Sequence, residues 1–255
     1  RRCRPTGSTL TVYLTGHTAL TLYLVASIVW LAFSLVLSPW INTDDPQVSA
    51  LLRPCRSPYL TRLFWIATLL ADPRVIPLLA IAVGLLLLMW GRRAEAVLLA
   101  VTLLGGVVAQ TLIGVAFRRP RPPEVFALIK EPASFSFPSA HAFTGLLLAG
   151  VIVFVFWRTA RGVRERLATL FVAGLIVVAV GLSRVYLGVH WPSDVIASWS
   201  LALALLCATW AGYLMLVRYR GLREQWPVWS TRRVHWAVTA VAALSAIVAV
   251  VATRS

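Results

Sequence analysis

The stretch that decides the fold is AVLLAVTLLGGVVAQTLIGVAF, residues 96–117, followed directly by RRPRP, residues 118–122. The apolar part has the length, roughly 17–25 residues, that an α-helix needs to cross a bilayer. The part that follows adds arginines and prolines where that helix must end. Because charged side chains are expensive near hydrocarbon, such a cluster at the end of an apolar run is a candidate functional site.

The composition of the whole chain favours a membrane-spanning fold. Of its 255 residues, 59% are hydrophobic and only 13% are charged, and the mean hydropathy is +0.81. A soluble globular domain is about 45–50% apolar. The formal net charge of +15 comes from basic residues that fall mostly between apolar runs. Membrane topology and anionic lipid headgroups account for them, so we expect an integral membrane protein with no nucleic-acid partner.

Apolar runs of similar length recur along the chain and predict an all-α, polytopic membrane helix bundle. We expect spanning helices at residues 18–37, 75–91, 96–117, 139–157, 167–182 and 195–217, with a seventh at 235–253. Residues 46–70 mix apolar side chains with arginines, which predicts one or two amphipathic helices at the membrane interface. A break should follow at Asp72-Pro73.

The chain divides into a membrane-embedded domain at residues 1–217 and a basic loop with an additional C-terminal transmembrane helix at 218–255. Because the chain starts Arg1-Arg2-Cys3-Arg4 rather than with Met, we expect it to be part of a longer or processed protein. The first apolar run is too long for the core of a signal peptide and lacks a small-residue cleavage pattern. We therefore expect it to be a retained helix.

Orientation follows from the basic residues in alternate connections, since cytoplasmic connections carry the excess. One set of connections holds 14 arginines, and the other set holds 8 basic residues, several of which belong to the candidate site. The 14-residue side is predicted to be cytoplasmic. Three polar clusters, at residues 118–122, 139–141 and 184–194, then fall at the non-cytoplasmic ends of their helices, which indicates a single site on the outer face of the inner (plasma) membrane.

The segment Pro138-Ser139-Ala140-His141 has a proline where a helix should begin, a favoured place for a residue without an N–H group. The free N–H groups of Ser139 and Ala140, together with the Ser139 hydroxyl, would face an anion. The alternative is an ordinary proline-led helix start with a polar first turn.

The segment His190-Trp191-Pro192-Ser193-Asp194 repeats this arrangement before the next helix. The Asp194 carboxylate can fold back to accept a hydrogen bond from the His190 imidazole, which would leave the other ring nitrogen free to attack. Taken alone, a His and an Asp at this spacing are more often an interfacial pair or a helix cap.

Arg184 ends the helix before His190, and Arg121 lies in a basic turn, stiffened by prolines, that follows the helix predicted at residues 96–117. A guanidinium group stays charged and donates hydrogen bonds in a fork that matches phosphate oxygens. Lipid-headgroup anchoring is the alternative role, but it would not require the histidines. The three clusters together therefore predict a phosphate-handling site.

The chain resembles the type 2 phosphatidic acid phosphatase superfamily through three motifs, which are Arg119-Pro120-Arg121-Pro122, Pro138-Ser139-Ala140-His141, and Ser183-Arg184 followed by His190 and Asp194. That family includes bacterial undecaprenyl pyrophosphate phosphatases, phosphatidylglycerophosphate phosphatases and lipid A phosphatases. The resemblance covers approximately Tyr59 to Val217, and its last motif is highly specific. It implies a metal-independent phosphatase whose motif-bearing core is residues 59–217, within a phosphatase domain formed by the six helices predicted between residues 18 and 217.

The resemblance also implies a role for each site residue. His190 would be the nucleophile that forms a phosphohistidine, Asp194 would orient it, and His141 would protonate the leaving oxygen. The phosphate would be held by Arg121, Ser139, the Ala140 backbone N–H and Arg184. No cofactor and no metal is implied, and the sequence offers no carboxylate cluster for one.

The chain departs from the family pattern at two positions. Gly114 stands where the family has a phosphate-binding lysine, and Arg118, four residues later on the same helix face, is expected to substitute for it. Ala140 stands where glycine is common in the family. If this position contributes only its backbone N–H, alanine is compatible with that role.

A site at the bilayer surface predicts a lipid phosphate or diphosphate substrate, with a polyprenyl diphosphate of the undecaprenyl type as the first candidate. Two alternatives stay open: a lipid-to-lipid phosphotransferase that uses the same site, and a catalytically weak member that binds or transports lipid. The sequence leaves the oligomeric state open.

Overall fold

The computed structural model describes residues 38–130, 134–160 and 162–219, and every regular element within these ranges is a helix. The helices predicted at 18–37 and 235–253 lie outside the described residues. The elements are α2 (Ser38–Leu51), α3 (Pro58–Leu69), α4 (Val75–Met89), α5 (Arg93–Phe117), the 3₁₀ helix η1 (Glu124–Phe126), α6 (Ala140–Thr159), α7 (Val163–Tyr186) and α8 (Pro192–Tyr219). The predicted all-α fold is confirmed for this part of the chain.

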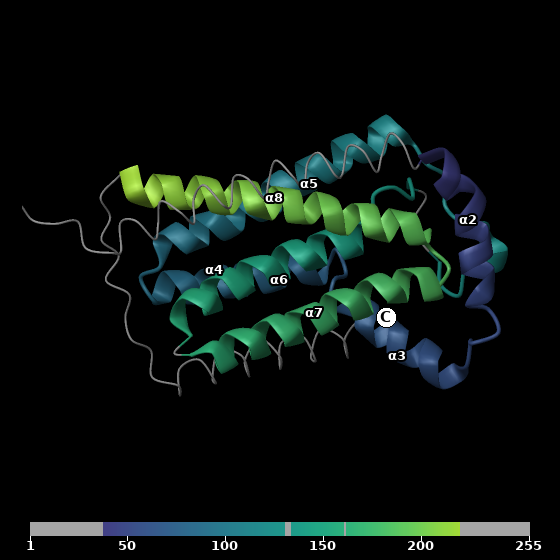
Figure 1. Ribbon diagram of the computed structural model, residues 1–255, viewed down its shortest axis with the longest axis horizontal. Coiled ribbons are helices and arrows are strands. Elements are labelled where there is room, and N and C mark those ends of the chain that lie inside the picture. Colours follow the sequence, from purple (N-terminus) through teal and green to yellow (C-terminus); the bar gives the residue numbers. More distant parts are fainter. Residues whose placement is uncertain (1–37, 131–133, 161, 220–255) are drawn as a thin grey trace, which may run out of the picture.

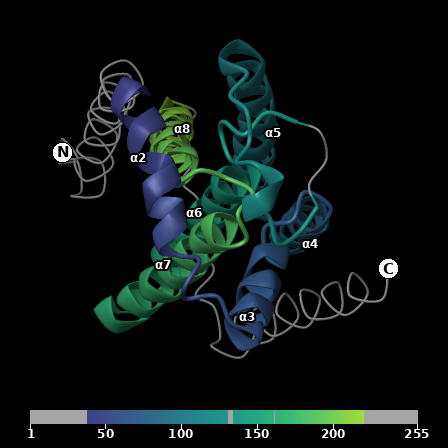
Figure 2. The ribbon, with the colours of Figure 1, turned by 90° about the vertical axis from the view of Figure 1, so that its right-hand side faces the viewer.

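Helix α6 lies at the centre of the bundle, where it packs against α5, α7 and α8 (Figures 1 and 2). Its residues Phe143, Leu147 and Val151 are completely buried. Small residues let the neighbours approach closely: a Cβ atom on Gly106 of α5 would lie 2.3 Å from the Leu147 side chain. The core is therefore formed by helices that the sequence predicted as spanning segments.

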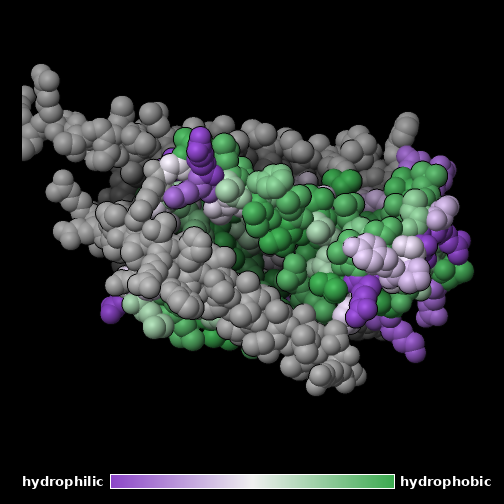
Figure 3. All heavy atoms as spheres, turned by 90° about the horizontal axis from the view of Figure 1, so that it is seen from below, coloured by the Kyte–Doolittle hydropathy of each residue, from purple (hydrophilic) through white to green (hydrophobic). Residues whose placement is uncertain are grey.

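Four helices, α5 to α8, are long and apolar enough to cross a membrane, and the protein is a multi-pass membrane protein. Many of their large hydrophobic side chains point outward, among them Leu104, Leu112 and Phe171, each about two-thirds exposed. Figure 3 shows hydrophobic side chains over the middle of the described surface and hydrophilic ones toward its ends. This distribution fits a belt of lipid around the bundle.

Helix α4 is shorter than the sequence predicted for residues 75–91. It has 15 residues and is therefore about 22 Å long, against a hydrocarbon core of about 30 Å. The helix ends where Gly91 takes a left-handed φ of 71°, a conformation that stops an α-helix. The expected span is thus replaced by a shorter apolar helix.

Residues 46–70 form parts of two helices, as expected, although α2 begins earlier, at Ser38. Helix α2 lies across one end of the bundle and contacts α8, whereas α3 packs against α7 (Figure 1). Ser57 caps α3 by accepting a hydrogen bond from the Leu60 N–H at 3.3 Å, and the predicted break at Asp72-Pro73 separates α3 from α4.

The three polar clusters meet at the end of the bundle that α2 crosses. Helices α5 and α7 end there, and α6 and α8 begin there (Figure 1). Side-chain contacts join residues 119, 121, 136, 190 and 194 directly. The prediction that the clusters share one end of the membrane helices is confirmed.

Candidate active site

His190 is held in the turn between α7 and α8, which only a glycine at position 188 permits. Gly188 has a φ of 74°, and a Cβ atom there would lie 1.8 Å from the Phe126 carbonyl oxygen of η1. The turn is closed by hydrogen bonds from the Val189 and His190 N–H groups to the Arg184 carbonyl, at 3.2 and 3.3 Å. The chain therefore places His190 on a rigid turn.

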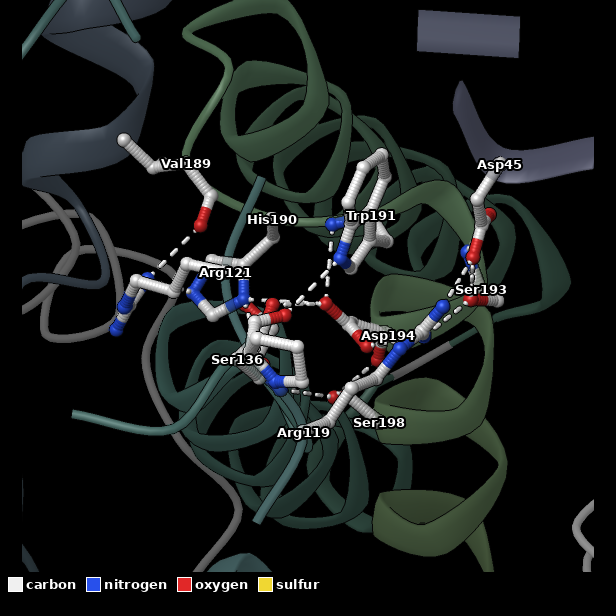
Figure 4. A network of polar contacts seen from close by, with 12 residues as sticks. Asp45, Arg119, Arg121, Ser136, Val189, His190, Trp191, Ser193, Asp194 and Ser198 are labelled. Atoms are coloured by element: carbon white, nitrogen blue, oxygen red, sulfur yellow. Dashed lines mark hydrogen bonds and ion pairs between the residues drawn. The ribbon is translucent and has the colours of Figure 1, made fainter. Parts of the chain in front are cut away.

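The hydrogen bonds of the His190 ring define its tautomer (Figure 4). Nδ1 lies 2.7 Å from the Ser136 carbonyl oxygen, and Nε2 lies 3.2 Å from a guanidinium nitrogen of Arg121. A carbonyl oxygen only accepts and a guanidinium only donates, so Nδ1 carries the proton and Nε2 presents its lone pair. This is the form that a nucleophile at Nε2 requires.

Burial lowers the pKa of His190 below its ordinary value of 6.5. The positive charges of Arg184 and Arg121 act in the same direction, and the nearby carboxylate of Asp194 opposes them. The imidazole therefore stays neutral, and able to attack, to lower pH than an exposed histidine would.

Asp194 lies beside His190, but the hydrogen bond expected between them is absent. Its Oδ2 atom is 3.6 Å from Nδ1, too far for a hydrogen bond, and the Ser136 carbonyl takes the ring proton instead. Asp194 accepts hydrogen bonds from the Ser136 hydroxyl and from the Trp191 N–H at 3.0 Å. It therefore acts on His190 through its charge and through Ser136, which contacts both.

The contact with the Trp191 N–H also makes Asp194 a cap of α8, because the side chain of the third helical residue reaches back to the N–H of the residue that precedes the helix. The capping role that the sequence allowed as an alternative is present together with the contact to His190.

Arg121 is fixed in front of His190 by bonds that leave its charge directed at Nε2. Its guanidinium donates to the Val189 carbonyl at 2.8 Å, to the Ser134 carbonyl at 3.1 Å and to the Ser134 hydroxyl at 2.8 Å. The group is half-buried. A fixed guanidinium beside a lone pair can bind the phosphate that the nucleophile attacks.

Arg184 and His141 complete the centre of the site. Arg184 is buried, donates to the Thr68 hydroxyl of α3 at 2.7 Å, and acts electrostatically on both histidines. His141, in the first turn of α6, is buried and lies within electrostatic reach of Arg184, His190 and Arg121. The structure thus brings together all five of the residues for which the resemblance implied the main chemistry.

Ser139 and Ala140 begin α6, but their N–H groups have different surroundings. The Ser139 N–H donates to the Ser198 hydroxyl at 2.7 Å, so the expectation that it faces an anion is wrong. Its own hydroxyl is buried and has no hydrogen-bond partner among the described residues. The Ala140 N–H stands at the first helical position, where the helix itself supplies no acceptor.

Arg118 does not join the cluster. It ends α5 in the left-handed conformation with a φ of 46°, is exposed, and donates to the Val115 carbonyl at 3.1 Å. The argument that placed it on the same helix face as Gly114 fails because the helix stops at Phe117. A Cβ atom on Gly114 would lie 3.4 Å from the Phe137 carbonyl, so that position does face the segment before α6.

Sequence reasoning missed Asp45, Arg119 and Ser136. Arg119 donates to Asp194 and to Asp45 of α2, each at 2.6 Å, and Asp45 is buried. The sequence offered one signal for this contact: Asp45 is an acidic residue on the same predicted outer side as the basic cluster at residues 118–122. Within the described ranges, no group of three or more His, Cys, Asp or Glu residues has the arrangement of a metal site.

The helix ends thus form a buried histidine–arginine–aspartate site in a multi-pass membrane protein, and the sequence places that site in a family. Residues 94–218 match the PAP2 superfamily, so this region is a PAP2 superfamily domain. It contains all of the five residues that carry the predicted chemistry.

Two curated proteins are similar over part of their length. Phosphatidylglycerophosphatase B of Bacillus subtilis is 38% identical over 81 residues, which are 31% of this chain and 40% of that protein. Undecaprenyl-diphosphatase of Sulfolobus acidocaldarius is 32% identical over 93 residues, 35% of this chain and 36% of that protein. The matched region therefore spans well under half of either relative.

The fold is similar to a solved structure, the crystal structure of a transmembrane PAP2 type phosphatidylglycerolphosphate phosphatase from Bacillus subtilis. The TM-score is 0.65 at 24% sequence identity, and the match covers 82% of this chain and 98% of that one. This likeness supports the bundle architecture.

Proposed function

We propose that this protein is a lipid phosphatase that removes a terminal phosphate from a lipid phosphate or diphosphate through a phosphohistidine on His190. The observation that carries the proposal is the His190 ring itself: Nδ1 is 2.7 Å from the Ser136 carbonyl and Nε2 is 3.2 Å from Arg121. A neutral nucleophile with its lone pair beside a fixed guanidinium suits attack on a phosphate.

In the first step, Nε2 of His190 forms a bond to phosphorus while the bond from phosphorus to the lipid-side oxygen breaks. Protonated His141 gives its proton to that leaving oxygen, which departs as the lipid alcohol or lipid phosphate. Arg121, Arg184, the Ser139 hydroxyl and the Ala140 N–H neutralise the charge on the three remaining oxygens.

In the second step, a water molecule attacks the phosphohistidine and gives its proton to His141, now the base. The bond between phosphorus and nitrogen breaks, and inorganic phosphate leaves. Both histidines return to their starting protonation states. Every step uses groups of this chain and water, so the proposed reaction needs no metal or cofactor.

The substrate is proposed from the position of the site and from the relatives. The site lies at one end of the membrane helices, where a phosphate headgroup can enter while its tail stays among lipids. The relatives are named for phosphatidylglycerophosphate and undecaprenyl diphosphate. We propose a polyprenyl diphosphate first, at the non-cytoplasmic face of the inner membrane, because the arginine-rich connections lie at the other end of the bundle.

The test is phosphate release from polyprenyl diphosphate, phosphatidic acid, phosphatidylglycerophosphate and lipid A, with His190→Ala as the blank. We expect release that persists in the presence of a chelator and is lost in the variant. A strict metal requirement, or equal release by His190→Ala, would contradict the mechanism. Release that depends on an added lipid acceptor would identify a phosphotransferase, and binding without release a lipid-binding member.

A further inference from the structure

Asp45, on α2, lies outside the residues that match the family, yet it contacts the first turn of α8 (Figure 4). Its carboxylate accepts hydrogen bonds from the Ser193 N–H at 3.1 Å and from the Ser193 hydroxyl. The residue before Pro192 is Trp191, whose side chain cannot cap a helix. Asp45 therefore supplies from another helix an acceptor for the Ser193 N–H, in addition to the cap that Asp194 provides.

Arg119 joins this cap to the site. Its two terminal guanidinium nitrogens divide between two carboxylates, one at 2.6 Å from Asp194 and the other at 2.6 Å from Asp45. The first also donates to the Ser193 hydroxyl at 2.7 Å. The guanidinium lies 5.9 Å from the centre of the Trp191 ring, which covers it.

The burial of these groups makes their pairing consequential. Asp194 is fully buried and Asp45 is 4% exposed, and the Arg119 side chain is 16% exposed. A buried carboxylate without a partner is strongly unfavourable, so Asp194 stays charged and in place only while its donors hold it. Those donors are Arg119, the Ser136 hydroxyl and the Trp191 N–H.

We propose that Arg119 and Asp45 are positioning residues for the reaction proposed above: together they fix Asp194 and the first turn of α8, and through them the Nδ1 side of His190. Both would act through Asp194 and Ser193, which they contact, and not on the phosphate itself. Arg119 holds the Asp194 carboxylate 3.6 Å from Nδ1, and Asp45 holds Arg119. The inference rests on the proposed function and extends the site to a helix beyond the family match.

The charged groups around His190 give this proposal a specific signature in pH. They are Asp45 on α2, Arg119 and Arg121 after α5, His141 on α6, Arg184 on α7 and Asp194 on α8. Without Arg119, the negative charge of Asp194 is less compensated and favours the protonated imidazole. Without the charge of Asp45, the charge of Arg119 is less compensated and has the opposite effect.

The experiment compares Arg119→Ala, Arg119→Lys, Asp45→Asn and the double variant Arg119→Ala/Asp45→Asn with the wild type. Arg93→Ala, an exposed arginine at the start of α5, is the matched control. Phosphate release from one lipid substrate is measured against pH and substrate concentration, and thermal stability in detergent reports folding. Asp45→Asn is nearly isosteric and keeps an acceptor for Ser193, so it guards against simple failure to fold.

We expect Arg119→Ala to lower kcat about 10–100-fold, the range typical of lost outer-shell support, with KM changed less than about threefold. The acid limb of its pH profile should move to higher pH, whereas that of Asp45→Asn should move to lower pH. Arg119→Lys should be intermediate, because an ammonium cannot bridge two carboxylates with a fork. The double variant should resemble Arg119→Ala, since both changes interrupt one chain of contacts.

Unchanged kcat in folded Arg119→Ala would overturn the proposal. The proposal would also be overturned if activity fell only in proportion to the amount of folded protein and the pH profile of the remaining activity were unchanged. A wild-type protein that releases no phosphate would overturn the proposed function and this inference with it. If the wild type releases phosphate and the variants release it equally well, only this inference is overturned and the proposed function stands.

Discussion

Helix α5 has an arginine in contact with buried carboxylates at each end, and the two groups differ in what they join. At its start, Arg92 donates to Glu95 at 2.7 and 3.1 Å, within one helical turn. Just beyond its other end, Arg119 contacts Asp194 and Asp45, which lie 75 and 74 residues away in the chain. The first pair is local, whereas the second joins three separate segments.

The two ends also differ in charge balance. Arg92 and Glu95 are both buried and neutralise one another, which is a purely structural solution. At the other end, the guanidinium groups of Arg119, Arg121 and Arg184 outnumber the carboxylates of Asp45 and Asp194. Burial of charge alone does not mark a functional site. A positive surplus around the neutral His190 does, because it leaves room for an anion.

The largest difference is expected between two buried arginines, Arg92 just before α5 and Arg184 in the last turn of α7. Arg184→Gln should lower phosphate release about 10²–10³-fold, because it removes a fixed cation from the charge that develops during transfer. Arg92→Gln should leave the activity of the folded protein within about twofold, but lower stability by about 3–5 kcal/mol, since it leaves Glu95 buried without its partner. Kinetics and thermal denaturation in detergent measure both. Equal losses of kcat would show that burial, and not phosphate contact, decides the effect.

A second comparison uses two glycines with nearly the same backbone conformation. Gly188 has a φ of 74° and Gly91 a φ of 71°, but a Cβ atom would meet the Phe126 carbonyl at 1.8 Å in the first case and nothing within 4 Å in the second. Gly91→Ala should therefore cost about 1–2 kcal/mol, the backbone cost alone. Gly188→Ala should lower the melting temperature several times further and displace His190.

The readouts are thermal denaturation and phosphate release by the folded fraction. If both alanine variants lost similar stability, the close approach of η1 to the turn would not be what fixes His190.

The third effect is a shift in pH dependence. Neutral His190 is the active form, and because burial lowers its pKa, activity should decline only as pH falls through a value below 6.5. In the residual activity of Arg184→Gln, this acid limb should move to higher pH, because a positive charge that disfavours the imidazolium is gone. Both pH profiles are measured with the same substrate, so the ionisation of the substrate affects the wild type and the variant equally. A limb that moved to lower pH, or stayed in place, would contradict the assigned nucleophile.

The sequence predicted helices α5 to α8, and the five candidate site residues that lie together, because both predictions depend on local patterns. Apolar runs of membrane length predict helices, and the spacing of Arg184, His190 and Asp194 lies within one turn region. The partners of these residues depend on packing instead. Nothing local indicates that the Ser136 carbonyl would accept the His190 proton, or that Asp45 would reach Ser193 across 148 residues.

Helix ends were the least predictable feature, and the end of α5 decided whether Arg118 belongs to the site. Extending α5 by one residue would have placed Arg118 on the face of Gly114, but Arg118 instead adopts a left-handed conformation that few residues other than glycine favour. The same stop places Arg119 against Asp194. A one-residue difference at a helix terminus therefore keeps Arg118 out of the site and brings Arg119 into contact with Asp194.

The smallest effect is expected for Arg118, and the matched variant at Arg121 makes it informative. Arg118→Gly removes an exposed side chain whose only described bond is to Val115, and glycine suits the φ of 46° at that position. Phosphate release should stay within about twofold of the wild type, with stability equal or higher by up to about 1 kcal/mol. Arg121→Ala should lose about 10²-fold or more, since it removes a cation fixed beside Nε2. A loss of comparable size in Arg118→Gly would mean that substrate draws Arg118 into the site as the replacement for the lysine absent at Gly114. The bound lipid, and not the fold of the free protein, would then determine which arginines bind the phosphate.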